Sequence, residues 1–212
     1  MLQTTSEVES DQEDLAPPTA VDGTPLSAKA AERRRRIIEA AIELGTQGGY
    51  EAVHMRDVAG GADVALATVY RYFVSKDHLL SAAISEWTAQ LQARLARSPA
   101  EGDTPVDRLV DVLRRASRGL ERRPLLAAAL VRALGSPDPG VADAAAHVRG
   151  QIKEMAGPYL DGLSGSQVED VVSVLGHVWN STLMIWAHGH APISAIGDEL
   201  ERAARLLLGG AR

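Results

Sequence analysis

Apolar side chains recur every three to four residues along most of the chain from residue 29 onward, and this periodicity constrains the fold most strongly. Ile37, Ala41 and Leu44, for example, share one face of a helix because they are separated by four and three residues. No stretch of useful length alternates polar and apolar residues as a half-buried strand does, and no repeat of fixed period occurs. The sequence therefore predicts an all-α protein with about nine helices.

Clusters of glycine, proline and polar residues separate the periodic stretches and mark where helices end. Gly48 and Gly49 end the first helix, and Ser75 occupies the N-cap position of a long helix that passes Leu91. The other helices are expected at residues 55–62, 65–73, 106–120, 124–134, 141–160, 167–186 and 193–208.

The first 28 residues differ from the rest in charge and composition. They hold six of the 28 acidic residues and no lysine or arginine, so they account for the whole net charge of −6. The remaining 22 acidic residues balance 22 basic ones, and the rest of the chain is neutral. Because residues 1–28 are almost free of large apolar side chains, they are expected to form a disordered acidic tail.

Absent features also limit the possible functions. Without cysteine, the chain has no disulfide, thiolate metal site or cysteine nucleophile. No apolar run approaches the length that crosses a bilayer, and the N-terminus lacks the basic start and apolar core of a secretion signal. The predicted location is the cytoplasm, with no membrane partner.

Residues 55–73 predict two short helices joined by a tight turn at Asp63 and Val64, the geometry of a helix-turn-helix. Asp63 suits this turn because aspartate adopts the left-handed conformation more readily than most residues. Each helix has one buried pair of residues four apart: Val58 and Ala62 in the first, Val69 and Phe73 in the second.

With Val69 and Phe73 buried, the remaining side chains of the second helix are expected to point outward. Hydroxyls, rings and a guanidinium add little to a protein core, but arginine bonds to the guanine edge and tyrosine hydroxyls bond to phosphates. The outward set is Ala67, Thr68, Arg71 and Tyr72, flanked by Tyr70. This face predicts contact with the major groove of DNA.

The string from Thr68 to Phe73 (TVYRYF), followed by Lys76-Asp77 and Leu79, resembles the DNA-binding domain of the TetR family of one-component bacterial repressors. The resemblance covers residues 33–80. It implies a three-helix DNA-binding domain at residues 29–80, a larger helical domain at 81–212 for ligand binding and dimerisation, and no enzymatic activity. The implied DNA-binding residues are Arg56, Ala67, Thr68, Tyr70, Arg71, Tyr72 and Lys76, with Arg71 as the base contact and the hydroxyls and Lys76 on phosphates. The Arg33–Arg36 run precedes the first apolar stripe, where family members contact the DNA backbone, although such a run is usually a solvated helix face.

The chain departs from the family pattern around the turn. Asp63 replaces the usual glycine, and Ala65 replaces the serine that caps the recognition helix, which is expected to cost about 1 kcal/mol. Gly60 and Gly61 further weaken the first helix of the pair. These substitutions predict reduced base specificity without disturbing the phosphate contacts.

One recognition helix covers half a site, and two must lie about 34 Å apart to enter successive major grooves. The protein is therefore expected to be a homodimer on a palindromic double-stranded operator. The helix at residues 167–186 is apolar on two sides, which indicates two partners. The resemblance implies that it and the last helix pair with their copies, and the proposed dimerisation residues are Val174, Val178, Ile185, Leu200, Ala203 and Leu207.

The resemblance also implies a small apolar effector in the larger domain, with no cofactor or metal. The proposed effector-binding residues are Trp87, Leu126, Leu130, Leu134, Met155, Tyr159, His177, Trp179 and Asn180. For each of them ordinary core packing is the alternative, and an interhelical hydrogen bond is an equal alternative for His177 and Asn180. The acidic extension and the string DVALATVYRYF resemble repressors of actinobacterial sterol catabolism, which implies a steroid effector as its CoA thioester. Its phosphates would meet Arg122 and Arg123, or Arg132.

Two other functions fit parts of the sequence. His188 and His190 offer two metal ligands for an enzyme, but no third ligand at helical spacing accompanies them. A helical adaptor whose helix-turn-helix no longer binds DNA is the second alternative, and the salt dependence of duplex binding separates it from a repressor.

Overall fold

The computed structural model describes residues 26–209, and over that range the backbone forms nine α-helices, one 3₁₀ helix and no strand, which confirms the all-α prediction. The predicted tail lies outside the described residues, except for its last three. Ser27 caps the first helix, and Leu26 packs against the core, so those three residues belong to the folded protein. The N-terminal helices are α1 (Ala28–Ala52), α2 (Met55–Gly61) and α3 (Leu66–Tyr72).

The larger domain follows with six further α-helices. They are α4 (Lys76–Arg97), α5 (Pro105–Glu121), α6 (Pro124–Leu134), α7 (Pro139–Ala156), α8 (Gly165–Ala187) and α9 (Ala195–Gly209), and the 3₁₀ helix is η1 (Gly157–Tyr159). Within the described part of the chain, no helix is long and apolar enough to cross a membrane.

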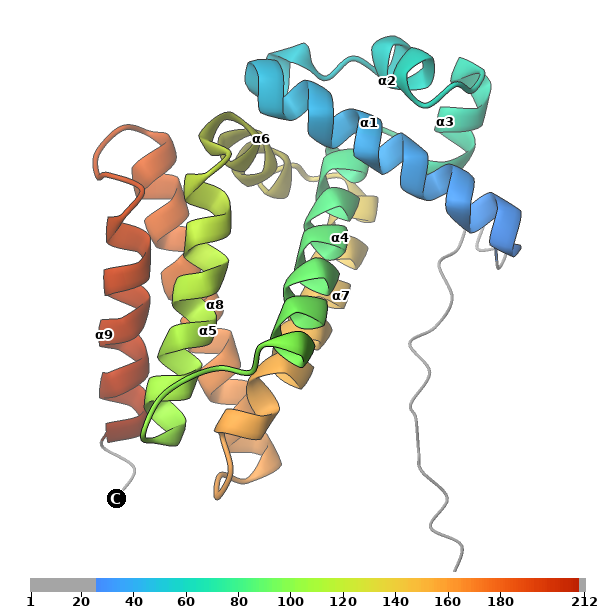
Figure 1. The fold of residues 1–212 in the computed structure, drawn as a ribbon. Helices are drawn as coiled ribbons and strands as arrows, with labels where there is room; N and C mark the ends of the chain where they lie inside the picture. The colour runs from blue at the N-terminus through green and yellow to red at the C-terminus, as the bar shows by residue number, and fades with distance from the viewer. Residues whose placement is uncertain (1–25, 210–212) are drawn as a thin grey trace, which may run out of the picture.

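Helix α1 lies across one end of the molecule, with α2 and α3 packed beside it (Figure 1). The predicted stop at Gly48 and Gly49 is a kink, after which the chain resumes one more helical turn. Gly49 has a φ of 66°, in the left-handed region that residues with a side chain rarely adopt. The kink turns the end of α1 toward α6, whose residue Leu125 lies against Gly49.

The α2–α3 turn has the predicted geometry. Asp63 has a φ of 52° and is the one non-glycine residue with positive φ in residues 26–209. Its N–H donates to the Gly60 carbonyl at 3.2 Å, and the Val64 N–H donates to the Ala59 carbonyl at 3.0 Å. These bonds keep the turn tight and fix the angle at which α3 leaves α2.

Replacing Ala65 by serine is expected to stabilise α3. Ala65 already has the extended backbone of an N-cap (φ −67°, ψ 145°) but offers no side-chain acceptor. A serine oxygen there would accept an N–H of the first turn and contribute about 1 kcal/mol. Amide hydrogen exchange in α3 should slow about fivefold. Ala67→Ser, which places a serine inside the helix and not at its cap, is the control. Equal slowing of amide exchange in the two variants would contradict the capping role of residue 65.

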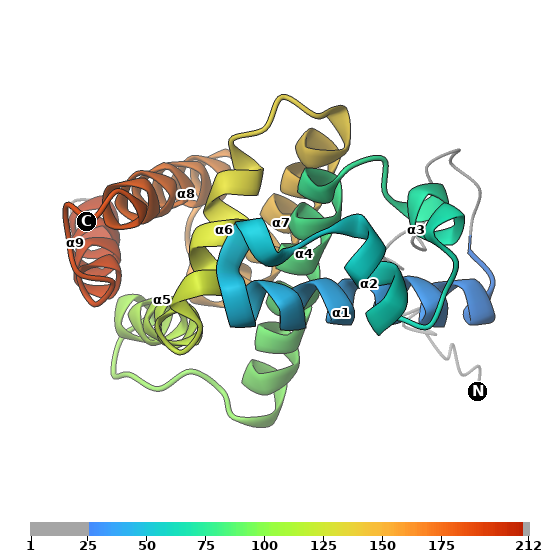
Figure 2. The same cartoon turned by 90° about the horizontal axis from the view of Figure 1, so that it is seen from above.

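The N-terminal helices share one core with the larger domain. Its buried members include Ile37, Val58 and Phe73 from the first three helices and their connections, and also Leu126 and Leu130 from α6. Seen from above, α1 crosses over α4 and α6 (Figure 2). A displacement of α6 therefore acts directly on the packing of α1.

The rest of the larger domain forms two further cores. Helix α9 packs against both α5 and α8, and α4 runs alongside α7 (Figure 1). The larger core contains Leu109, Ile196 and Leu200, all of them buried. A smaller core centres on Leu91 and Leu95 of α4. Trp87 packs against both, so the middle of α4 connects them.

Candidate functional site

The outer face of α2 and α3 presents most of the predicted DNA-binding side chains. Arg56, Ala67 and Arg71 are exposed, Tyr70 is 49% exposed, and Thr68 is half-buried. Arg71 and Tyr70 are adjacent on α3 and both face solvent. The structure thus brings a guanidinium and an aromatic hydroxyl together on the exposed surface of the second helix of the pair.

Tyr72 corrects the sequence analysis, because its side chain is only 1% exposed instead of pointing outward. It lies three residues after Val69, and that spacing places it at the edge of the buried face of α3. Its hydroxyl accepts a hydrogen bond from Nη2 of Arg71 at 3.0 Å, and the Arg71 guanidinium lies 5.1 Å from its ring centroid. Tyr72 therefore contacts the Arg71 guanidinium from the buried side of α3 and helps to hold it in place.

Two members of the Arg33–Arg36 run make contacts within the protein. The guanidinium of Arg34 lies 5.0 Å from the ring centroid of Phe73, and burial lowers its pKa. Arg35 forms ion pairs with Glu32 and Glu39 on the same helix. These two arginines stabilise α1 and its contact with the end of α3.

Lys76 is half-buried at the start of α4, where Ser75 caps the helix as predicted by accepting the His78 N–H at 3.0 Å. The Lys76 ammonium donates to the backbone carbonyl of Tyr50 at 3.0 Å and lies 3.7 Å from the Tyr50 ring centroid. Sequence reasoning missed Tyr50. Its position after a glycine pair and its aromatic character were the available signals.

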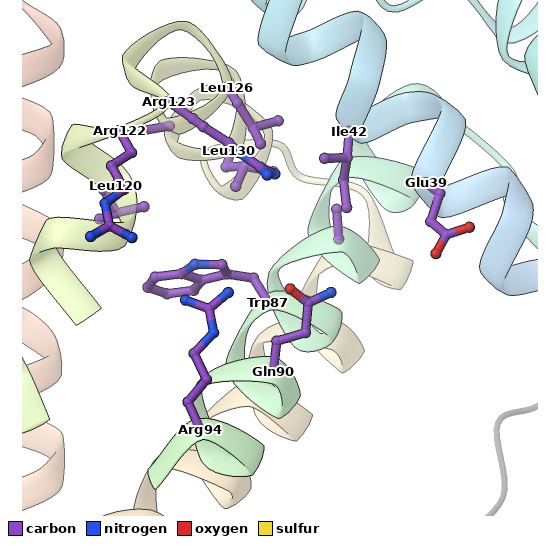
Figure 3. A pocket seen from close by; sticks show the side chains of 13 residues that line it. Glu39, Ile42, Trp87, Gln90, Arg94, Leu120, Arg122, Arg123, Leu126 and Leu130 are labelled. Carbon is purple, nitrogen blue, oxygen red and sulfur yellow. The ribbon is translucent and has the colours of Figure 1, made fainter. Parts of the chain in front are cut away.

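A cavity of about 260 Å³ lies between α1, α4, α6 and the end of α5. Its apolar wall includes Ile42, Trp87, Leu120, Leu126 and Leu130 (Figure 3). Three of these, Trp87, Leu126 and Leu130, are predicted effector-binding residues. At this cavity α1 of the DNA-binding helices and the helices of the larger domain line the same space.

Charged side chains also line this cavity. Arg94 comes from α4, and Arg122 and Arg123 from the α5–α6 turn, while Glu39 comes from α1 (Figure 3). The close-up shows the Arg94 side chain extending toward the Trp87 indole. Apolar groups beside three guanidinium groups suit a ligand that has an apolar body and an anionic group.

Of the other predicted effector residues, three pack against the core, one is half-buried at the end of α6 and two are exposed on α8. Trp179 packs edge-to-face on Trp87 with ring centroids 6.5 Å apart, and Met155 and Tyr159 pack against the same core. Leu134 is half-buried at the end of α6, away from the cavity lining.

His177 and Asn180 were expected inside the domain, and this expectation is wrong. Both are exposed on α8. The buried stripe of that helix contains Val171, Leu175 and Thr182, and the two polar residues are rotated away from it.

The outward face of α8 exposes several large apolar side chains. Val174 and Met184 are each 40% exposed and Ile185 is 45% exposed, with Val178 half-buried beside them. On α9, the sequence analysis missed Leu206, which is 73% exposed.

Leu200 corrects the predicted dimerisation set. It is fully buried in the protomer's own core, aligned with Ile196 and Ala204 along α9. Ala203 and Leu207 are half-buried at the edge of that core. Four-residue spacing identifies a buried stripe but does not tell whether the protein's own core or a second copy covers it.

The two histidines considered as metal ligands lie in the turn after α8. Their rings stack with centroids 6.4 Å apart, and Nδ1 of His188 lies 2.7 Å from the Met184 carbonyl oxygen. Residues 26–209 contain no group of three or more histidine, aspartate or glutamate side chains arranged to hold a metal.

Comparison with known proteins identifies the family. Residues 37–83 match the bacterial regulatory proteins of the tetR family, and residues 102–207 match the tetracyclin repressor-like C-terminal domain. The chain is 36% identical over 204 residues to the HTH-type transcriptional repressor KstR of Mycobacterium tuberculosis, with 92% of each chain covered. The chain belongs to the TetR family.

Solved TetR-family structures agree with this fold. A TetR transcriptional regulator from Rhodococcus sp. RHA1 superimposes with a TM-score of 0.73 at 29% identity, covering 87% of this chain and 98% of the other. FadR from Thermus thermophilus, in complex with lauroyl-CoA, has a TM-score of 0.67 at 27% identity, covering 84% and 95%. The similar proteins are named as transcriptional repressors or regulators and not as enzymes, so this TetR-family chain is a transcriptional regulator.

Proposed function

We propose that this TetR-family repressor acts in the cytoplasm as a homodimer, binds a palindromic operator, and is released from it by a large apolar CoA thioester. The observation that carries the proposal is the paired Tyr70 and Arg71 on the exposed face of α3, within a chain matched to repressors over most of its length. In this proposal residues 29–80 form the DNA-binding domain and residues 81–212 the effector and dimerisation domain.

The roles on DNA follow from exposure and chemistry. Arg71 is assigned to a base edge, because its guanidinium is exposed and supported by the Tyr72 hydroxyl. Arg56, Thr68 and Tyr70 are assigned to phosphates, with Lys76 at the start of α4. Ala67 is exposed and small, so α3 can approach the groove closely there. Tyr72 keeps an indirect role through Arg71.

The dimer is assigned to the outward face of α8 and the adjacent part of α9. Val174, Ile185 and Leu206 expose apolar surface there, and a self-complementary apolar face is typical of twofold dimers. His177 and Asn180 lie on the exposed side of α8 and are assigned to this interface instead of the effector site.

The cavity lining supports a CoA thioester as effector. KstR is the name of a repressor similar to this chain, and FadR was solved with lauroyl-CoA bound. Here Arg94, Arg122 and Arg123 offer guanidinium groups to phosphates beside the apolar wall. A steroid attached to CoA matches this combination of an apolar body and anionic groups.

The cavity volume supports a proposal for how the effector acts. At about 260 Å³ the cavity is smaller than the roughly 300–1,000 Å³ of pockets that hold drug-sized ligands. A steroid body therefore requires its walls to separate, and one wall is α1 of the DNA-binding domain. A ligand that favours this separated arrangement shifts the population away from the operator-binding one.

The test is operator binding as a function of salt and ligand. Duplexes selected from a random pool by the wild-type protein are titrated by fluorescence anisotropy. We expect affinity to fall about 10³-fold or more between roughly 50 and 200 mM salt. A steroid acyl-CoA thioester should weaken binding about 10- to 100-fold, within the usual range of coupling. Free CoA, which lacks the apolar body, should not.

Arg71→Ala provides the matched variant. It should reduce the preference for selected over random duplexes about 10- to 100-fold. Arg149→Ala, at an exposed position on α7, should leave that preference unchanged. Absence of any selective duplex binding at low salt would instead favour the adaptor. If the protein bound its selected duplexes but no thioester changed that affinity, the repressor function would stand and the proposed effector class would be wrong.

A further inference from the structure

Tyr50 lies where α1, α4 and α6 meet, and two cations lie against its ring. Nζ of Lys76, from the start of α4, is 3.7 Å from the ring centroid, and the guanidinium of Arg132, from α6, is 4.0 Å from it. Aromatic rings attract cations at these distances through their quadrupole. Tyr50 therefore joins the helix that follows the recognition helix to the helix that lines the cavity.

Hydrogen bonds fix the same group of residues. The Lys76 ammonium donates to the Tyr50 carbonyl at 3.0 Å, and the Tyr50 hydroxyl donates to Oδ1 of Asp77 at 2.6 Å. Burial, together with Asp77, raises the pKa of Tyr50 to about 12, so the hydroxyl keeps its proton at neutral pH. The first two residues of α4 are thus both attached to Tyr50.

Arg132 connects this group to the cavity wall but does not line the cavity, so the structure favours Arg122 and Arg123 over Arg132 as the arginines that meet the thioester phosphates. Its guanidinium donates to Oε1 of Glu51, next to Tyr50, at 2.6 Å. The same helix supplies Leu126 and Leu130 to the cavity. A ligand that separates the cavity walls by moving α6 would therefore displace Arg132 as well.

We propose that Tyr50 is a positioning residue that holds the Lys76 ammonium for a phosphate contact, and that Arg132 makes this hold depend on the position of α6. An ammonium already fixed on Tyr50 loses less conformational freedom when it meets a phosphate. When α6 moves, the Arg132 guanidinium moves Tyr50 with it, and Lys76 loses its fixed position. The inference rests on the proposed function, since it concerns operator release by the same cavity.

An effector-free double-mutant cycle tests the first half, with operator duplexes selected by the wild-type protein. Tyr50→Leu and Lys76→Gln should each weaken operator binding about tenfold, and the double variant should also weaken it only about tenfold. Tyr50→Phe keeps the ring and should bind within about twofold of wild type. Circular dichroism checks that each variant is folded. A double variant weakened about a hundredfold, or a folded Tyr50→Leu protein that binds like wild type, would overturn the proposal.

Arg132→Gln tests the second half and is safe for folding, because that side chain is 60% exposed. It should leave thioester affinity and ligand-free operator affinity within about twofold of wild type, yet reduce thioester-induced operator release about fivefold. Lys153→Gln removes another exposed ion pair, between α7 and α8, and should leave thioester-induced operator release unchanged. Unchanged release in Arg132→Gln would overturn the role of Arg132. If no thioester releases the wild-type protein, the effector class fails, and the ligand-free cycle still decides for or against Tyr50.

Discussion

Replacing Ile185 by aspartate is expected to convert the dimer into monomers and to weaken operator binding about 10³-fold. Ile185 is 45% exposed on the outward face of α8, beside Met184 at 40%. In a twofold dimer each substitution introduces two carboxylates, and burying an unpaired charge costs several kcal/mol. A monomer engages one half-site only, and its affinity falls toward that of non-specific binding.

Sedimentation velocity and operator titration measure the two effects together. Leu125→Asp is the matched control, because Leu125 is 51% exposed but lies on α6, outside the α8–α9 face. This control should remain dimeric, and an aspartate in the first turn of α6 also suits the helix dipole. A dimeric Ile185→Asp protein would place the interface elsewhere.

Helix positions were predictable because the signals that set them are local. Helix α6 begins at Pro124 and ends at Leu134, as the sequence predicts, since proline suits the first helical position and Gly135 follows the last. Asp63 adopts the predicted left-handed turn for a similarly local reason. In both cases a few neighbouring residues decide the backbone conformation.

Which neighbour covers a helix face was less predictable, because that depends on residues distant in sequence. Leu200 and Leu207 share a sequence stripe, yet Leu200 is fully buried within the protomer and Leu207 only half-buried. Likewise, the Tyr50 contacts bring together α1, α4 and α6, which no spacing in the sequence relates. Only the packing of the helices shows that Arg132 meets Tyr50.

Tyr72 illustrates the same limit within a single helix. Val69 and Phe73 define the buried side of α3, but a residue on the edge of that side can turn either way. The Tyr72 ring is buried in the core to which α1 and α4 also contribute, while the Tyr70 ring stays exposed. The two tyrosines of the YRYF string consequently have different physical roles.

Tyr72→Ala is therefore expected to lower the free energy of unfolding by about 3–5 kcal/mol, because it leaves a cavity the size of an aromatic ring in the core. Such a loss is a large part of the stability of a typical domain, and operator binding should fail because α3 is no longer ordered. Urea unfolding followed by circular dichroism gives the free energy, and amide hydrogen exchange localises the change to α2 and α3.

Tyr70→Ala is the counterpart on the exposed face of the same helix. Its free energy of unfolding should stay within about 0.5 kcal/mol of wild type, because the ring is half in solvent. Operator affinity should nevertheless fall about tenfold through loss of a phosphate contact. If Tyr72→Ala instead unfolded like wild type and lost only DNA binding, then Tyr72 would contact DNA directly, and the buried position that supports Arg71 would be wrong.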